Sequence, residues 1–179
     1  MKKLLMLLLL AGYASFFAHA QSVTCGSFKL VEQEVIYQQV FQDTVTLPML
    51  EKYYKSLPYV ANVATSAEGL QFDMNDIMVD YRKFQFNQNN TPQVIQTGKF
   101  SGKVTVGVRD GRYRIAVKSI QFIGNMGYKL ITKKENFTSY ASKNSATDWA
   151  QDFCLPGMLG LLDKAFTDKL QFKKAKDDW

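Results

Sequence analysis

The stretch Lys103–Val117, KVTVGVRDGRYRIAV, decides the fold of this chain. Asp110-Gly111 stands between two runs in which apolar and polar residues alternate. Asp-Gly is favoured in a two-residue type I′ turn, because both central residues of that turn need a positive φ. The turn fixes the register of a β-hairpin and turns six apolar side chains toward one side, which must be the core: Val104 with Val117, Val106 with Ile115, and Val108 with Tyr113.

The opposite side of this hairpin is basic. Its five basic side chains are Lys103, Arg109, Arg112, Arg114 and Lys118. Arginine binds carboxylates and phosphates through paired hydrogen bonds, so this face suits an anionic ligand such as an acidic glycan or a lipid headgroup. Gly107, opposite Arg114, leaves the backbone open to close approach. The competing interpretation is a solvated face that stays polar to prevent aggregation, with Asp110 neutralising part of the charge.

The sequence before the hairpin predicts a strand and then a short helix. Residues 30–42 are rich in Val, Ile, Tyr and Phe, but their alternation is mixed, which indicates a strand that is covered on both faces or bent. Thr46 caps a helix with one apolar stripe, and Pro58 ends it. Residues 61–69 are expected to be a connector.

Strands dominate the next part of the chain. We expect a short strand at 70–73, a turn at 73–76 and a second strand at 77–87, where a change of alternation predicts a bulge or bend. Residues 87–92 (NQNNTP) form a turn or exposed loop. Beyond the hairpin the alternation shifts after Lys118, so the strand should bend there.

The C-terminal region, about 146–175, is expected to be helical, and residues 128–132 can form one more strand. Trp149 and Phe153 would belong to a first helical piece, broken at Pro156-Gly157. The main helix has apolar residues at steps of three and four: Leu159, Leu162, Phe166 and Leu170. The order strand, helix, antiparallel strands, helix indicates an α+β protein, with a single antiparallel sheet and helices packed on one face.

This order and the stretch Gly102–Phe122 resemble a family of exported bacterial domains of unknown function with a TATA-box-binding-protein-like fold. The motif that carries the resemblance is Arg109-Asp110-Gly111-Arg112-Tyr113-Arg114. The likeness covers about 31–124, and the C-terminal helix more loosely. It implies a TBP-like α+β fold and an exported protein, with no established activity. Likeness to a DNA-binding fold is not evidence of DNA binding.

The N-terminus predicts export. Lys2 and Lys3, an apolar run over 4–17 and the small residues around His19 have the form of a secretory signal peptide, residues 1–20, cleaved after Ala20. Removing two lysines lowers the formal net charge from +6 to +4. The mature chain, 21–179, has the length of one domain, with 21–27 as a loose leader and no second apolar run long enough to span a bilayer. We expect it in the periplasm or secreted.

Two cysteines remain in the mature chain, Cys25 and Cys154. Export permits a disulfide between them, which would tie the mature N-terminus to the C-terminal region. The alternatives are two unpaired thiols, or a lipid anchor on Cys25. The anchor fits poorly because Val23-Thr24 precedes the cysteine, where a small residue is required.

The mature sequence contains few residues that are suited to catalysis. Cleavage removes His19, the only histidine, which excludes Ser-His and Cys-His arrangements. Asp73, Asp76 and Asp80 could supply paired carboxylates, but the first two are expected in a turn. Two cysteines do not make a zinc site, and the aspartates lack the glycine and glutamate of a calcium loop. We therefore expect no catalytic residues, no metal and no cofactor.

The sequence therefore favours a non-enzymatic binding or interaction module of the periplasm or cell envelope, which would bind an anionic glycan, a lipid headgroup or an envelope protein through the basic hairpin face. Nucleic acid is not an expected partner, since an exported protein rarely meets it. Two other hypotheses stay open. One is a histidine-free hydrolase that uses carboxylates near 73–80, and the other is a structural accessory subunit of an envelope complex.

Overall fold

The predicted hairpin lies at the centre of an eight-stranded sheet in the computed structural model, which describes residues 24–66 and 69–174. The strands are β1 (Thr24–Cys25), β2 (Phe28–Val31), β3 (Glu34–Gln42), β4 (Val60–Ser66), β5 (Gly69–Met78), β6 (Lys99–Arg109), β7 (Arg112–Asn125) and β8 (Leu130–Asn136). Their order is β1-β2-β3-β7-β6-β5-β4, with β8 also paired to β7, and every pair is antiparallel. The predicted signal peptide, 1–20, lies outside the described residues.

The register of the hairpin is confirmed. Strands β6 and β7 pair Val108 with Tyr113 and continue in step to Lys103 opposite Lys118. Asp110 and Gly111 have φ values of 50° and 71°, as the two-residue turn requires. The bend expected after Lys118 is also present, as a shift of register between the two strands.

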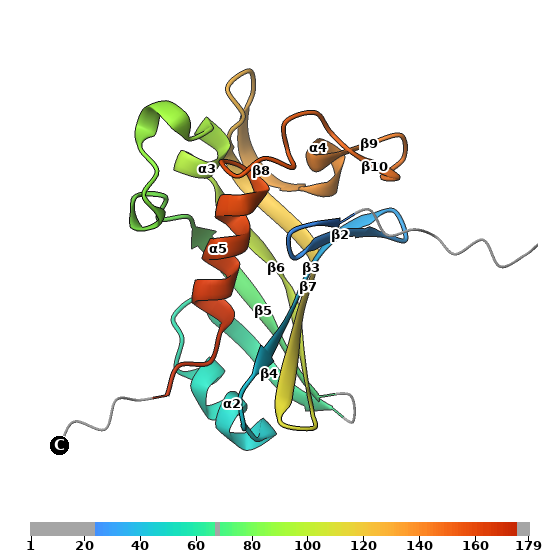
Figure 1. Ribbon diagram of the computed structural model, residues 1–179, viewed down its shortest axis with the longest axis vertical. Helices are drawn as coiled ribbons and strands as arrows, with labels where there is room; N and C mark the ends of the chain where they lie inside the picture. Colours follow the sequence, from blue (N-terminus) through green and yellow to red (C-terminus); the bar gives the residue numbers. More distant parts are fainter. Residues whose placement is uncertain (1–23, 67–68, 175–179) are drawn as a thin grey trace, which may run out of the picture.

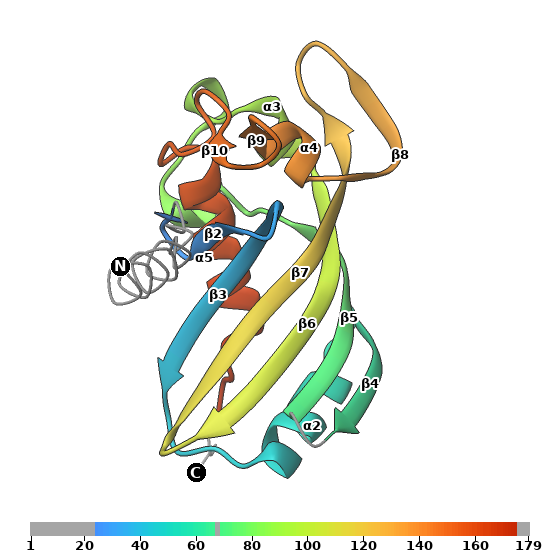
Figure 2. The ribbon, with the colours of Figure 1, turned by 90° about the vertical axis from the view of Figure 1, so that its right-hand side faces the viewer.

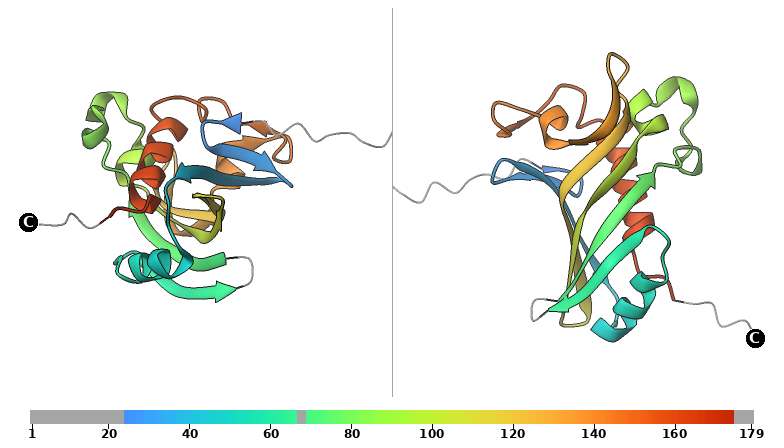
Figure 3. Two further views of the ribbon diagram at one scale, coloured as in Figure 1. Left: turned by 60° about the horizontal axis from the view of Figure 1, so that its bottom comes forward. Right: turned by 180° about the vertical axis from the view of Figure 1, so that it is seen from behind.

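Helices cover one face of this sheet, which confirms the predicted α+β class. The long helix α5 (Leu159–Leu170) lies against one side of the strands, and α2 (Leu47–Lys55) lies at the end of the sheet beside β4 (Figure 1). Figure 2 shows the opposite side, where the strands stand in front of α5. The strands twist and curl around this helical layer (Figure 3). Short helices α3 (Gln93–Thr97) and α4 (Thr138–Ala141) lie at the far end.

The core lies between the sheet and α5. Phe166 of α5 makes ring contacts with Phe28, Tyr37 and Phe100, one from each of three strands. All four side chains are fully buried. Burial of a large apolar side chain stabilises a fold by about 1.5–3 kcal/mol, so this aromatic cluster holds α5 on the sheet.

The helix predicted after Thr46 is confirmed, and its cap is present: the Thr46 side chain accepts a hydrogen bond from the Met49 amide. The single strand predicted over 30–42 is wrong in part. Glu32 and Gln33 have positive φ values and form a turn, so the run is divided into β2 and β3. Residues 24–25, expected in a loose leader, form β1.

The connector predicted at 61–69 is wrong, because most of it is strand β4. The turn predicted at 73–76 is also wrong, since β5 runs through it. Both strands contain a bulge, with positive φ values at Asn62 and Asp76. Asn and Asp tolerate the left-handed conformation in bulges as they do in turns, and this led to the error.

The strand predicted at 77–87 is wrong, because β5 ends at Met78 and the chain continues in two 3₁₀ turns, Arg82–Phe84 and Gln88–Asn90. The second turn confirms the exposed loop expected at 87–92. In the C-terminal region, Trp149 lies in a small hairpin of β9 (Ser142–Lys143) and β10 (Asp148–Trp149), not in a helix. The main helix is confirmed as α5.

The disulfide between Cys25 and Cys154 is present, with the two Cα atoms 5.6 Å apart. It joins strand β1 to the segment that precedes α5. Among the described helices, none is long and apolar enough to cross a membrane.

Candidate functional site

The basic hairpin face is the sheet surface that carries no helix, here called the outer face. Each of the five predicted basic side chains is exposed on it: Lys103, Arg109, Arg112, Arg114 and Lys118. They alternate along β6 and β7 with the buried side chains of the core, because successive residues of a strand point to opposite faces. The sheet therefore places all five cations on one surface, as predicted.

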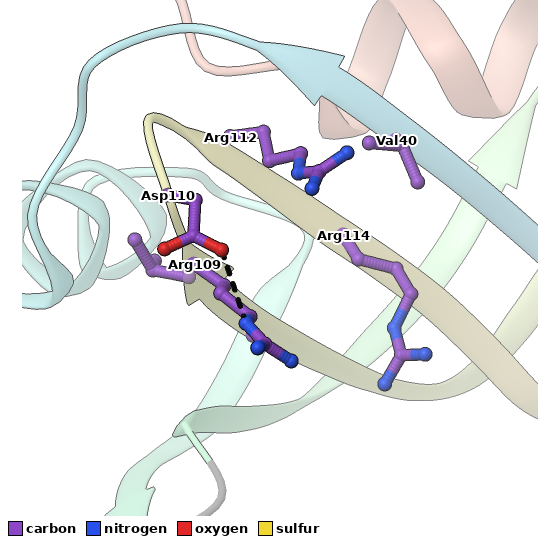
Figure 4. A pocket seen from close by; sticks show the side chains of 7 residues that line it. Val40, Arg109, Asp110, Arg112 and Arg114 are labelled. Atoms are coloured by element: carbon purple, nitrogen blue, oxygen red, sulfur yellow. Dashed lines mark hydrogen bonds and ion pairs between the residues drawn. The ribbon is translucent and has the colours of Figure 1, made fainter.

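Three arginines surround a hollow at the turn end of the hairpin. The hollow has a volume of about 550 Å³ and is lined by Val40, Gly107, Val108, Arg109, Asp110, Arg112 and Arg114. Figure 4 shows the side chains of Arg109, Arg112 and Arg114 placed around it, with Val40 contributed by the neighbouring strand β3. Because Gly107 has no side chain, it leaves open backbone between Arg109 and Arg114.

Charge in this hollow is only partly neutralised. Arg109 forms an exposed ion pair with Asp110, at 3.1 Å from Nε to Oδ2 (Figure 4). Among the described residues, Arg112 and Arg114 form no ion pair with a carboxylate. Their guanidinium groups keep their donors available, and each can bind an anion through two parallel hydrogen bonds.

The other end of the outer face is basic and acidic at once. Lys103 lies directly opposite Asp73 of β5, and the Asp73 carboxylate accepts a 2.7 Å hydrogen bond from the Asn62 side chain. Lys134 of β8 also reaches this region, where its ammonium group lies 3.7 Å from the Asp76 carboxylate. This end of the outer face therefore presents both hydrogen-bond donors and hydrogen-bond acceptors.

No protein-family model and no curated protein matches the sequence. Among solved structures, the chain is similar to a TBP-like protein from Parabacteroides distasonis, with 12% identity, a TM-score of 0.44, and coverage of 81% of this chain and 90% of that one. It is also similar to a DUF4468 family protein from Bacteroides ovatus, with 13% identity, a TM-score of 0.39, and coverage of 85% and 83%.

Neither name states an activity. The fold class rests on the sheet and helices described above.

The three aspartates proposed as a catalytic group do not come together as one. Asp73 and Asp76 line the mixed end of the outer face, where Asn62 and Lys134 contact them. Asp80 lies beyond the end of β5 and accepts a hydrogen bond from the Lys83 amide. In residues 24–66 and 69–174, no three His, Cys, Asp or Glu side chains are grouped so that they could hold a metal ion.

Two residues of this surface were missed from the sequence. Lys134 lies in a polar, poorly periodic stretch that predicted no register, so nothing placed it beside Lys103. Val40 is 44% exposed on the outer face. Ile36, four positions earlier in β3 and of the same parity, was the available signal: the two apolar residues gave the mixed alternation of that strand.

Proposed function

We propose that this protein is a non-enzymatic binding module of the periplasm or cell envelope, and that the outer face binds an anionic partner. One observation carries the proposal: Arg112 and Arg114 stand over an open hollow of about 550 Å³ without a carboxylate partner among the described residues. Unpaired guanidinium groups around a concave surface suit carboxylate, sulfate or phosphate groups.

Export is supported by two independent features. The disulfide between Cys25 and Cys154 fits an oxidising compartment such as the periplasm. The N-terminal sequence has the form of a signal peptide. An acidic glycan or an anionic lipid headgroup of the envelope is then a partner that the protein would meet.

The test is binding of the mature chain, 21–179, to a panel of acidic envelope glycans and anionic lipid headgroups, at low and at physiological salt. We expect saturable binding that weakens with salt, because exposed charges are screened over about 8 Å at physiological ionic strength. Arg112→Glu with Arg114→Glu should lower the affinity at least tenfold without changing the melting temperature, since both side chains are exposed.

A matched control removes the same net charge elsewhere. Lys52 on α2 and Lys143 on β9 are exposed and form no ion pair with other described residues. The double variant Lys52→Glu with Lys143→Glu should bind as the unaltered protein does. Equal loss in both double variants would show that only net charge matters, and unchanged binding in the arginine variant would reject the outer face as the site.

A further inference from the structure

The outer face contains three hollows in a line along β6 and β7. The first is the arginine-lined hollow at the turn. The second, of about 350 Å³, is lined by residues of β4, β5, β6 and β7, among them Asn62, Gln71, Asp73, Lys103, Lys118 and Ser119. The third, of about 200 Å³, shares Asp73, Lys103 and Ser119 with the second and extends to Gln121 and Lys134. We call this line the basic track.

Cations are concentrated at the two ends of the track. Its arginine end is formed by Arg109, Arg112 and Arg114, and its lysine end by Lys103, Lys118 and Lys134. Arg109 and Lys103 are six residues apart on the same strand. At about 3.4 Å per residue, these two residues are about 20 Å apart, and Arg114 and Lys118, four residues apart on β7, are about 14 Å apart. A single compact headgroup can therefore contact one end only.

The floor between the two ends is low and uncharged. Gly107 and Thr105 follow one another on the outer face of β6, with Ala116 of β7 directly opposite Thr105. Gln71 of β5 extends this row. Small side chains in the middle let an extended ligand lie against the sheet while both of its ends reach charged groups.

The lysine end offers more than positive charge. Asp73 and Asp76 add carboxylates beside the lysines, and Asn62 and Gln121 add amides. Carboxylates repel a ligand that is anionic at every unit, whereas they accept hydrogen bonds from hydroxyl groups. The ligand that fits this mixture has hydroxyl groups between well-separated acidic groups.

We infer that the basic track binds a linear acidic glycan that lies along β6 and β7 and spans both ends. An acidic group of the glycan binds at the arginine end, and hydroxyl groups with a further acidic group bind at the lysine end. This inference rests on the proposed function and narrows it from anionic partners in general to one extended class.

Among the described residues, the basic track lacks the accessible aromatic rings that a single-stranded nucleic acid needs. Phe72 is the one aromatic residue among the described residues that line the three hollows, and it is only 3% exposed. Proteins that bind single strands generally provide accessible rings on which bases stack. The glycan is therefore the occupant that these residues favour.

The test uses a glycan in which acidic and neutral sugars alternate, and compares a disaccharide of glucuronate and N-acetylglucosamine with an octasaccharide of the same two sugars, using the mature protein. In the unaltered protein, the octasaccharide should bind much more tightly, because a chain held at one end meets the second end at high effective concentration. Lys103→Glu with Lys118→Glu should reduce this length gain at least tenfold. The same variant should leave disaccharide binding nearly unchanged, since a separation of about 14–20 Å exceeds the screening distance at physiological salt.

The gain in affinity from disaccharide to octasaccharide is compared between the unaltered protein and the lysine-end variant. A longer saccharide also offers more binding registers, and this statistical gain is the same in both proteins. Arg112→Glu with Arg114→Glu should weaken both saccharides, and methyl-esterified octasaccharide should not bind. Melting temperatures of both variants establish that they are folded.

The possible failures are separable. A length gain that persists in the lysine-end variant overturns the track and leaves the arginine hollow as the site. Binding to anionic phospholipid vesicles but to neither saccharide overturns the glycan and retains the proposed function. Absence of binding to saccharides and vesicles alike overturns both.

Discussion

At the scale of single residues, two glycines show two different reasons for the absence of a side chain: a positive φ, and a lack of room for a Cβ atom. Gly111, in the hairpin turn, has a φ of 71°, and a Cβ atom built there would meet nothing within 4 Å. Gly69, at the start of β5, has a φ of 126°, and a Cβ atom there would lie 2.1 Å from the Val106 carbonyl oxygen. Both positions favour glycine, but only Gly69 is also closed by the neighbouring strand.

We therefore expect different costs for alanine at the two glycines. Gly111→Ala should lower the free energy of unfolding by about 1–2 kcal/mol, the cost of a left-handed non-glycine residue. Gly69→Ala should cost more, about 3 kcal/mol or above, because strain adds to a clash with backbone that cannot move alone. Urea unfolding of both variants measures this. Equal costs would mean that β5 shifts to relieve the clash.

At the scale of elements, α5 is held at its C-terminus by tyrosines. Tyr54 donates a 2.6 Å hydrogen bond to the carbonyl of Leu170, Tyr53 donates one to Gln171, and Tyr59 donates one to Lys169. The last carbonyls of a helix have no partner within the helix. These bonds supply partners from α2 and the segment that follows it, and so join the two helices.

Because these tyrosine hydroxyl groups are buried, the stability that they give to the end of α5 depends on pH. Burial raises the pKa of Tyr59 to about 12 and raises that of Tyr54 further, with neighbouring tyrosines adding to the effect at both. An unfolded tyrosine has a pKa of about 10. A group with a raised folded pKa gives stability that is complete below the unfolded pKa and is lost as pH rises above it.

Tyr54→Phe should therefore show two changes. Near neutral pH, the variant should lose about 1–3 kcal/mol, because the buried Leu170 carbonyl loses its donor. Between about pH 9 and pH 11, it should lose less stability than the unaltered protein, which still contains the buried phenol. Urea unfolding at each pH measures both. Tyr128→Phe is the control, since Tyr128 is 78% exposed; the same alkaline loss in all three proteins would contradict the assignment.

Elements with a strong local signal were the ones that the sequence predicted. The Asp-Gly turn and the capped helix at 47–55 have the residues that their geometry requires, and both are present. Strand β4 and the middle of β5 were missed because bulges at Asn62 and Asp76 interrupt the period of two. The basic face followed from the hairpin alone, whereas Lys134 depends on the pairing of β8, for which the sequence contains no turn motif.

At the scale of the whole molecule, one covalent bond joins the start of the described chain to its C-terminal region. The Cys25–Cys154 disulfide spans 129 positions of sequence and ties β1 to the segment before α5. In the chain-entropy account, closing so long a loop removes many conformations from the unfolded chain and stabilises the fold by about 4 kcal/mol or less. Sequence alone left this bond open against two free thiols.

Reduction should therefore lower the midpoint of urea unfolding, since Cys154 is in an exposed segment that a reductant can reach. The double variant Cys25→Ala with Cys154→Ala should unfold at the midpoint of the reduced protein and should not respond to the reductant. An unaltered midpoint after complete reduction, verified by thiol titration, would show that the bond adds nothing to stability.

The alternation along β6 and β7 has a consequence for how such a molecule can change over time. Core-forming and outward-facing side chains occupy different positions of the same two strands: Val104, Val106, Ile115 and Val117 are buried, whereas Lys103, Arg109, Arg112 and Arg114 are exposed. Substitutions in the second set leave the first set untouched. Selection can therefore change the charge and shape of the outer face while the framework that supports it is inherited intact.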